Sequence, residues 1–312
     1  MECMSQPNPT PLTGVQYDIA AGGYRATVTE LGAGLRALTW NGRPLVTGYE
    51  PDELPPAGAG QLLAPWPNRV DGGRYSFGGA SYQLELSEAA QGNAIHGLAR
   101  WANWQQASRS ASEVTLTHLL LGRPGYPFCL DLSATYGLDR NGLTVSITAR
   151  NAGSRPAPYG TGSHPYLSAG ASLVDDCELR IDAGAWLPAD DRGIPSGPPR
   201  DVSGSALDFR TARPVGQRRL DHALTDLTRD GAGRTWARLS YGGTRLGLWA
   251  GPGYRWLQVF TGDALPPGRS RRALAVEPMT CPPNAFVTGD DLLVLRPGQA
   301  LTHQWGISVL DS

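Results

Sequence analysis

Two of the five histidines lie in segments where a side chain could face a ligand. His96 is followed by a glycine, and His164 comes two residues after one. Because glycine lets the backbone approach a bound molecule closely, either ring could serve a site as an acid or base near neutral pH. A structural histidine is the equally open interpretation of both. His118 and His303 lie in alternating apolar and polar runs, which favours strand residues satisfied by their neighbours.

Glu277 has the most distinctive position among the carboxylates. It ends the apolar run 273–276 and precedes a proline-containing corner at 278–286. A carboxylate that leaves a buried strand at such a corner would be partly desolvated, which raises its pKa toward the range useful to a general base. A strand-end glutamate paired with an arginine is the structural alternative, and the residues alone leave both open.

Several other chemistries lack the residues that they need. All 27 basic residues are arginine, so lysine Schiff-base catalysis and the phosphate-binding P-loop are excluded. The sequences HExxH, CxxC, GxGxxG and GxSxG are absent, so a zinc site would have to be assembled from distant ligands, and dinucleotide chemistry and serine hydrolysis are disfavoured. The residues therefore predict no metal site.

The overall charge also limits the partners. The 27 basic and 28 acidic residues give a formal charge of −1, so no global field attracts nucleic acid or an anionic membrane. We expect a small or neutral partner, and the sequence is silent on oligomeric state. Residues 1–12 lack an apolar targeting core and predict a flexible N-terminus. No run approaches 18 apolar residues, so a cytoplasmic protein is expected.

The elements that must position these groups are predicted to be short strands. The 40 glycines and 26 prolines fall between alternating runs, and long 3.6-residue periods are missing. Turn residues 139–142 and 241–244 each join two runs into a predicted hairpin. The proline-rich stretch Leu187 to Pro214 is interpreted as a long loop and not as a domain linker. The prediction is a single domain over 1–312, all-β, built as a large antiparallel β-sandwich. The alternating runs are Tyr24 to Thr29, Leu35 to Trp40, Ser81 to Leu86, Val114 to Leu120, Leu143 to Thr148, Glu178 to Asp182, Arg255 to Phe260 and Ile307 to Leu310.

Eight segments in order resemble the aldose 1-epimerase (galactose mutarotase) family, and together they span nearly the whole chain. Each segment is weak alone, but eight in the same order are very specific. They are Leu31-Gly32-Ala33-Gly34, Pro65-Trp66-Pro67-Asn68-Arg69, Asn93-Ala94-Ile95-His96-Gly97, Gly125-Tyr126-Pro127, Gly162-Ser163-His164-Pro165-Tyr166, Leu220-Asp221-His222, Leu257-Gln258-Val259-Phe260-Thr261 and Glu277 through Phe286.

The resemblance implies a β-sandwich enzyme that interconverts the α and β anomers of an aldohexose without a cofactor. Ring opening requires a base on the C1 hydroxyl and an acid on the ring oxygen, and these should flank the anomeric centre. By similarity to the family, Glu277 is the base and His164 the acid. Hydroxyl-holding roles fall by the same similarity to four matched residues, Asn68, Arg69, His96 and Asp221.

Details of the matched segments leave other readings open. Asn68 could instead stabilise a turn, and Trp66 beside it could offer its ring to the sugar's C–H face. Many family members carry a second glycine after His96-Gly97, where this chain has Leu98 and then Arg100 and Trp101, and His222 could be an extra contact or a bystander.

The departures put the identity of the sugar in doubt, so glucose, galactose and a modified or acidic hexose all stay open. Two other functions also stay open: a non-catalytic carbohydrate-binding or sugar-sensing protein, and a related enzyme on the same fold. The related enzyme could be a hexose-phosphate epimerase or a polysaccharide lyase or hydrolase. A phosphorylated substrate should require additional arginines at the cleft.

Overall fold

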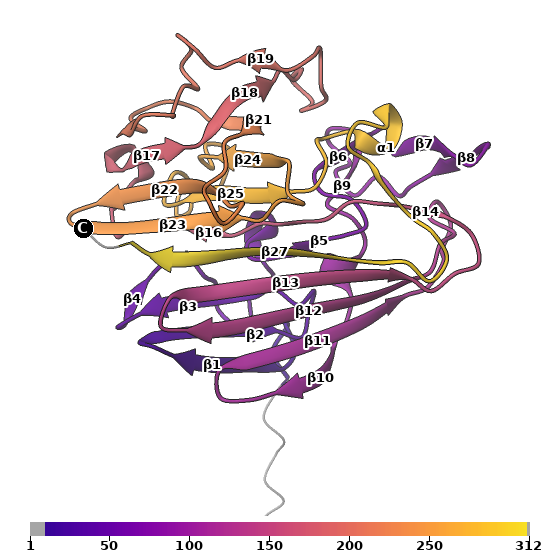
Figure 1. Cartoon of the computed structure of the whole chain (residues 1–312), viewed down its shortest axis with the longest axis horizontal. Helices are drawn as coiled ribbons and strands as arrows, with labels where there is room; N and C mark the ends of the chain where they lie inside the picture. The colour runs from indigo at the N-terminus through magenta and orange to yellow at the C-terminus, as the bar shows by residue number, and fades with distance from the viewer. Residues whose placement is uncertain (1–9, 311–312) are drawn as a thin grey trace, which may run out of the picture.

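The computed structural model describes residues 10–310, and almost all of its regular structure is β. Strands within both large sheets pair antiparallel, which confirms the predicted all-β sandwich (Figure 1). Residues 1–9 of the predicted flexible N-terminus lie outside the described residues. No helix within residues 10–310 has the length and apolar character needed to cross a membrane.

The larger sheet has nine strands, and its central strands show why alternating residues form it. Along the strand Leu130–Asp139, apolar side chains at every second position are buried while their neighbours are partly exposed, the period-2 pattern of a sheet with one face on the core. In sheet order the strands are β10 (Gln105–Arg109), β11 (Glu113–Leu120), β12 (Leu130–Asp139), β13 (Gly142–Asn151), β27 (Ala300–Val309), β23 (Thr244–Ala250), β22 (Thr235–Tyr241), β17 (Glu178–Ile181) and β20 (Arg213–Pro214).

The second large sheet differs because its central strand is buried on both faces. All six residues of Leu274–Met279 are buried, and this apolar strand carries Glu277. Its path is β19 (Arg200–Asp201), β18 (Ala183–Leu187), β21 (Asp221–Leu227), β24 (Trp256–Phe260), β25 (Leu274–Met279), β15 (Gly162–Ser163) and β5 (Leu62–Leu63), with β16 (Tyr166–Leu167) also paired to β25.

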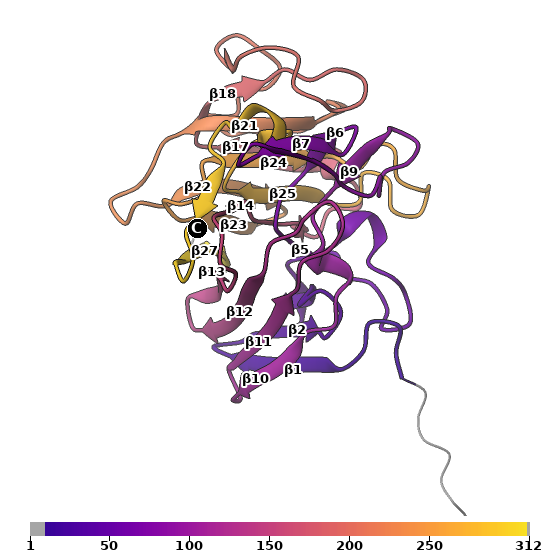
Figure 2. The same cartoon turned by 90° about the vertical axis from the view of Figure 1, so that its right-hand side faces the viewer.

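Smaller elements complete the molecule (Figure 2). A four-stranded N-terminal sheet contacts the larger sheet through β12. Its strands are β1 (Gln16–Ala21), β2 (Tyr24–Thr29), β3 (Leu35–Trp40) and β4 (Arg43–Pro44). Three two-stranded pairs are β6 (Arg69–Asp71) with β9 (Asn93–Ile95), β7 (Arg74–Phe77) with β8 (Ala80–Gln83), and β14 (Ala157–Tyr159) with β26 (Leu293–Leu295). The helical turns are η1 (Pro56–Gly58), η2 (Ala99–Trp101), η3 (Val174–Asp176) and α1 (Ala285–Thr288).

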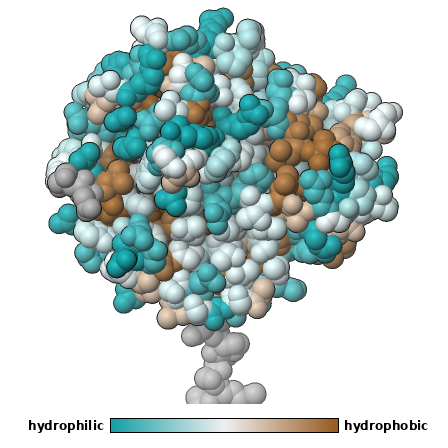
Figure 3. Space-filling view, viewed as in Figure 1, coloured by the Kyte–Doolittle hydropathy of each residue, from teal (hydrophilic) through white to brown (hydrophobic). Residues whose placement is uncertain are grey.

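One continuous hydrophobic core joins these sheets. It includes fully buried aromatic side chains such as Trp104, Trp305 and Tyr136. Most of the surface seen in Figure 3 is hydrophilic or of intermediate hydropathy, with groups of apolar side chains toward the right and the left of the view. The exposed apolar side chains include Val287 on α1 and Val294 on β26. Packed sheets fix the positions of the side chains between them, so a site built on this core is rigid.

Most of the predicted strands occur in the structure. The runs 24–29 and 35–40 match β2 and β3, and the hairpins β12–β13 and β22–β23 form at the predicted turns. Three bounds differ by three residues or more: β8 ends at Gln83, before the predicted Leu86, β13 continues to Asn151, beyond the predicted Thr148, and β27 begins at Ala300, well before Ile307. The stretch 187–214 connects the two large sheets, from the end of β18 to β20.

Candidate active site

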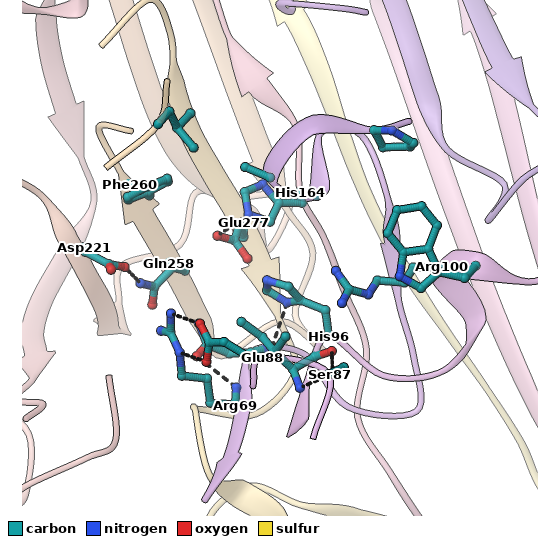
Figure 4. A pocket seen from close by; sticks show the side chains of 17 residues that line it. Arg69, Ser87, Glu88, His96, Arg100, His164, Asp221, Gln258, Phe260 and Glu277 are labelled. Atoms are coloured by element: carbon teal, nitrogen blue, oxygen red, sulfur yellow. Dashed lines mark hydrogen bonds and ion pairs between the residues drawn. The ribbon is translucent and has the colours of Figure 1, made fainter. Parts of the chain in front are cut away.

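A cavity of about 340 Å³ lies beside β25, within the size range of small-molecule sites. All six residues that the sequence singled out as site candidates line it (Figure 4). The lining residues are Pro55, Ala57, Gly58, Asn68, Arg69, Ser87, Glu88, Ile95, His96, Arg100, Trp101, His164, Asp221, Gln258, Phe260, Leu265 and Glu277.

A carboxylate and an imidazole meet directly in this cavity. Nε2 of His164 lies 3.2 Å from Oε1 of Glu277, although the two residues are 113 positions apart in the chain. Both side chains are buried, with 5% and 3% of their surfaces exposed. They lie side by side, so nothing can enter between them, whereas the sequence suggested groups that flank the anomeric centre. The two groups can still act on one sugar from the same side, because both reacting oxygens of the sugar are bonded to C1.

Two strands of the second large sheet, β25 and β15, position this pair. Glu277 faces the cavity from β25, where it is the cross-strand partner of Gln258 on β24. His164 follows the short strand β15, and its ring stacks on Tyr166 with a centroid distance of 5.0 Å. The Tyr166 hydroxyl in turn donates to the carbonyl of Ala57 at 3.1 Å. The imidazole is therefore held in one plane before any ligand binds.

Burial dominates the acid–base properties of the pair. Desolvation raises the pKa of Glu277 well above its ordinary value, with Asp221 raising it further and Arg69 opposing. Desolvation lowers the pKa of His164 to about 3, and nearby Arg100 lowers it too. The sequence predicted the direction for Glu277, but the ordinary imidazole pKa assumed for His164 was wrong for the free site. Both shifts favour a neutral pair that shares one proton.

His96 lies beside the pair and has its tautomer set by the backbone. The N–H of Asn68 donates to Nδ1 of His96 at 3.2 Å, so the proton of the neutral ring is on Nε2. Burial, followed by the charges of His164, Arg100 and Arg69, lowers the pKa of His96 well below its ordinary value. The ring is packed edge-on to that of His164 at a centroid distance of 5.4 Å. His96 is thus a neutral donor at the cavity wall.

The distant ligands that a metal would need do come together here. His96, His164 and Glu277 each offer a ligand atom within 4.8 Å of the others, the donor set of some zinc sites. Metal-bound histidines normally donate an N–H from the nitrogen that does not bind the metal. In His96 that orientation is reversed, because Nδ1 accepts a hydrogen bond and Nε2 carries the proton. The donor set therefore fits a proton relay better than a metal.

Arg69 lines the cavity with its guanidinium already paired. Its Nε and Nη2 each donate to a carboxylate oxygen of Glu88 at 2.8 Å, a bidentate geometry. Glu88 also accepts from the side-chain amide of Asn93 at 3.1 Å. Arg69 was expected to grip sugar oxygens, and its fork is instead held in place by Glu88, which leaves Nη1 for a ligand.

Asn68 and Asp221 reach the cavity from different elements. Asn68 has a left-handed backbone, with φ of 51°, and its Oδ1 accepts the N–H of Arg69 at 2.9 Å, so the turn-stabilising role is present. The same residue lines the cavity, so the two interpretations are compatible. Asp221, on β21, accepts from Nε2 of Gln258 at 2.6 Å.

Two residues that the sequence analysis considered lie outside the cavity lining. His222 is adjacent to Asp221 on a strand, where successive side chains face opposite sides, and its ring packs edge-on against Trp186 at 5.5 Å. Trp66 is 2% exposed and packs against Phe286 in the core, so the proposed sugar platform on its ring is wrong. Trp101 and Phe260 are the aromatic rings at the cavity.

Glu88, Gln258 and Arg100 are among the polar residues of the lining that received no role from the sequence. Glu88 follows an alternating run without any local signal, so only the fold reveals its pairing with Arg69. Gln258 lay within a matched segment, and its register opposite Glu277 could have been inferred from a strand pairing. Arg100 was noted only as a departure, since nothing in the sequence shows that it faces the cavity.

Comparisons with known proteins show the family to which the chain is similar. The family described as aldose 1-epimerase matches residues 15–308. An uncharacterised Escherichia coli K12 protein, YihR, is 38% identical over 289 residues, which cover 92% of this chain and 91% of that protein. Human galactose mutarotase is 28% identical over 179 residues, covering 53% of this chain and 49% of the relative.

The fold is shared with solved structures at lower identity. The GalM/aldose epimerase homologue from C. elegans superposes with a TM-score of 0.85 at 22% identity, covering 95% of this chain and 98% of that chain. A galactose 1-epimerase from Lactobacillus acidophilus NCFM gives a TM-score of 0.79 at 21% identity, covering 93% and 92%. These likenesses place the sheets and connections of this chain in one fold with those proteins.

Proposed function

The chain belongs to the aldose 1-epimerase family, and we propose that it interconverts the α and β anomers of a free aldohexose by acid–base ring opening and reclosure. The observation that carries this proposal is the 3.2 Å contact between Glu277 and His164 inside the cavity. A protein that only held a sugar would have no need for a buried carboxylate and imidazole in contact.

Ring opening breaks one bond and moves two protons. Glu277 accepts the proton of the C1 hydroxyl as its oxygen forms the carbonyl, and the electron pair of the C1–O5 bond leaves with the ring oxygen. His164 donates a proton to that oxygen, which gives the open-chain aldehyde. Each such proton transfer by a positioned group contributes about 10²- to 10⁴-fold. No electron transfer takes place.

Reclosure reverses the two roles after rotation about the C1–C2 bond. The hydroxyl of C5 attacks the other face of the aldehyde and returns its proton to His164. The protonated Glu277 delivers its proton to the carbonyl oxygen, which becomes the new C1 hydroxyl. The pair finishes with the protons that it had at the start, so no proton is taken from or released to solvent.

The shared proton explains how a histidine with a depressed pKa can act as the acid. A neutral pair with the proton on Glu277 and an ionic pair with it on His164 contain the same number of protons. Transfer across the 3.2 Å contact therefore prepares the base and the acid together when a sugar replaces water. Loss of that proton at high pH removes the acid, so kcat/KM should fall as pH rises through the raised pKa of Glu277.

Hydroxyl groups of the ring would be held by the polar residues around the pair. Asp221 is an acceptor for hydroxyl protons, and the Nε2–H of His96 is a donor fixed by its backbone contact. Arg69 and Asn68 line the same cavity and offer further donors. These groups are fixed by Glu88 and by turns before ligand binding, which reduces the entropy lost on positioning the sugar.

The test follows anomeric exchange directly. Exchange of glucose, galactose and modified hexoses is measured by NMR or polarimetry with the native protein, Glu277→Gln and His164→Ala. We expect each variant to lose about 10²- to 10⁴-fold in kcat for the exchanged sugar. Equal exchange by all three proteins would end the catalytic assignment, and sugar binding without exchange by the native protein would indicate a carbohydrate-binding protein instead.

A further inference from the structure

Arg100 is a buried cation in the cavity that the acid–base mechanism does not use. Only 9% of its surface is exposed, and Figure 4 shows its guanidinium reaching toward His96. Its Nε has no hydrogen-bond partner within residues 10–310. Burial lowers its pKa to about 10, which still leaves the group charged near neutral pH. A buried charge without a hydrogen-bonded partner is costly, and a ligand that supplied one would be favoured.

The backbone around Arg100 is held firmly, so its position is part of the fold. Its carbonyl oxygen accepts from Nε2 of Gln61 at 3.1 Å. Gly32 approaches that carbonyl so closely that a Cβ there would lie 2.3 Å from the oxygen, with φ at 68°. This contact gives a reason for glycine within the matched segment 31–34. The guanidinium lies over the ring of Trp101 at 5.3 Å, which compensates only part of the buried charge.

The charges of the cavity are distributed unevenly. Arg69 donates two hydrogen bonds to the carboxylate of Glu88, which neutralises its charge, and Asp221 lies beyond the catalytic pair, on the side away from Arg100 (Figure 4). Glu88 acts on Arg100 only through space, since no hydrogen bond joins them within the described chain. One end of the cavity therefore presents a carboxylate to ring hydroxyls, while the other presents an unpaired cation.

We propose that the aldose exchanged at this site carries an anionic substituent, which Arg100 binds at the end of the cavity opposite Asp221. The inference rests on the proposed function and narrows its substrate class. A planar guanidinium can pair with a carboxylate or with a tetrahedral oxyanion. Either group would supply the hydrogen-bonded anionic partner that Arg100 lacks in the free cavity. A neutral hexose would displace water from Arg100 and return only hydroxyl contacts.

The experiment compares three sugars that differ in one substituent: D-glucose, D-glucuronate and D-glucose 6-phosphate. Anomeric exchange is measured by two-dimensional NMR for the native protein and for Arg100→Met, which keeps side-chain length without charge. We expect kcat/KM for at least one anionic sugar to exceed that for glucose by about 10- to 100-fold, the range of hydrogen bonds to charged groups. Arg100→Met should bring this ratio close to one, and Arg100→Lys should restore part of it.

Arg109→Met is the matched control. Arg109 also lies over an aromatic ring, that of Tyr17 at 6.0 Å, but it is exposed and outside the cavity. This variant should keep the native ratio. The proposal is overturned if kcat/KM for glucose equals kcat/KM for both anionic sugars. It is also overturned if Arg100→Met lowers the exchange of all three sugars by the same factor.

Failure of the proposed function gives a different result. If the native protein exchanges none of the sugars, calorimetric binding of glucuronate and glucose 6-phosphate still tests Arg100. Tighter binding of an anionic sugar than of glucose, lost in Arg100→Met, would support the anion site without catalysis. Equal or undetectable binding of all three sugars would reject it. The carboxylate and phosphate arms separate the two anion types.

Discussion

Two buried histidines, one on each large sheet, show which properties identify a functional side chain. His303 lies on β27 of the nine-stranded sheet, and His164 follows β15 of the eight-stranded sheet. Their exposed fractions are 6% and 4%, and burial lowers the pKa of both, to about 4 and about 3. Each has an Nδ1 without a hydrogen-bond partner in the described residues. By these measures alone the two residues are equivalent.

Their surroundings separate them. The ring of His303 packs against Tyr254 at 5.7 Å, and a Cβ on Gly253 would lie 2.2 Å from its Cδ2, so no space adjoins it. His164 contacts the carboxylate of Glu277 and borders a cavity. A perturbed pKa thus reports burial, whereas an ionisable partner next to open space indicates chemistry.

Replacing each histidine by asparagine tests most directly whether the two residues differ in function. His164→Asn should lower the rate of anomeric exchange by about 10²- to 10⁴-fold, because asparagine cannot transfer the proton. His303→Asn should keep the rate within about threefold, although it loses packing in the core and stability with it. Exchange NMR at saturating sugar and thermal unfolding measure the two effects. A similar loss of rate in both variants would mean that burial, which the two residues share, and not the carboxylate partner of His164, determines the effect.

Ion pairs in the two regions give the next contrast. Arg69 and Glu88 form a bidentate pair at the cavity with exposed fractions of 18% and 20%, while Arg150 and Asp131 on the nine-stranded sheet are 49% and 42% exposed. Glu88→Gln should raise KM by about tenfold with a smaller change in kcat, because Arg69 loses its fixed orientation. Asp131→Asn should leave both constants and stability nearly unchanged, as for most exposed pairs. Steady-state kinetics of both variants decide this.

The sequence anticipated the sheets better than it anticipated the contacts of the site. Alternation and turn residues are local signals, so β2, β3 and the hairpin β12–β13 could be read directly. His96, His164 and Glu277 were singled out from their local sequence, the other three candidates came from the resemblance to a family, and all six line one cavity. Their catalytic and binding roles stay predictions.

The features of the site that the sequence could not predict depend on which distant segments the fold brings together. Glu88 is paired with Arg69, and Arg100 reaches the cavity from η2, yet neither has a local pattern that indicates it. Trp66 stood beside the matched asparagine and arginine, but its ring turned to the core. The pKa of His164 also depends on burial by distant segments, which no spacing along the chain reveals.

Stability measured against pH should sharpen the contrast between the two sheets. The folded pKa of Glu277 is raised, so the wild-type loses stability as pH rises above about 4.5, where the unfolded carboxyl ionises first. Glu277→Gln removes this loss, so its stability relative to wild type should increase with rising pH. The folded pKa of His303 is lowered, so the stability of His303→Asn relative to wild type should increase as pH falls from about 6.5 toward 4.

Each slope is at most about 1.4 kcal/mol per pH unit in the free energy of unfolding. Urea unfolding of the wild type and both variants at four pH values between 4 and 8 measures them. Parallel pH dependences in the three proteins would contradict opposite titration shifts in the two regions.

The smallest effect concerns the connection that joins the two sheets. Within it, Nη2 of Arg192 donates to Asp71 at 2.7 Å and to Asn93 at 3.0 Å, next to the cavity wall. Gly193 approaches Arg69 so closely that a Cβ would lie 2.4 Å from its Nη1. The stretch 187–214 is therefore attached to the strands β6 and β9 that hold Arg69, and is more than a surface connection.

Arg192→Ala should loosen that attachment and raise KM about two- to threefold, because exposed ion pairs contribute little and the carbonyl of Arg192 still accepts from Asn93 at 3.1 Å. Limited proteolysis within 187–199 should become faster. Arg210 is the matched control, since within residues 10–310 its hydrogen bonds join only Asp208 and Ser203 of the same stretch. Arg210→Ala should leave KM unchanged. If both variants shift KM equally, the stretch acts by its general stability, and the contact between Arg192 and the cavity wall has no role of its own.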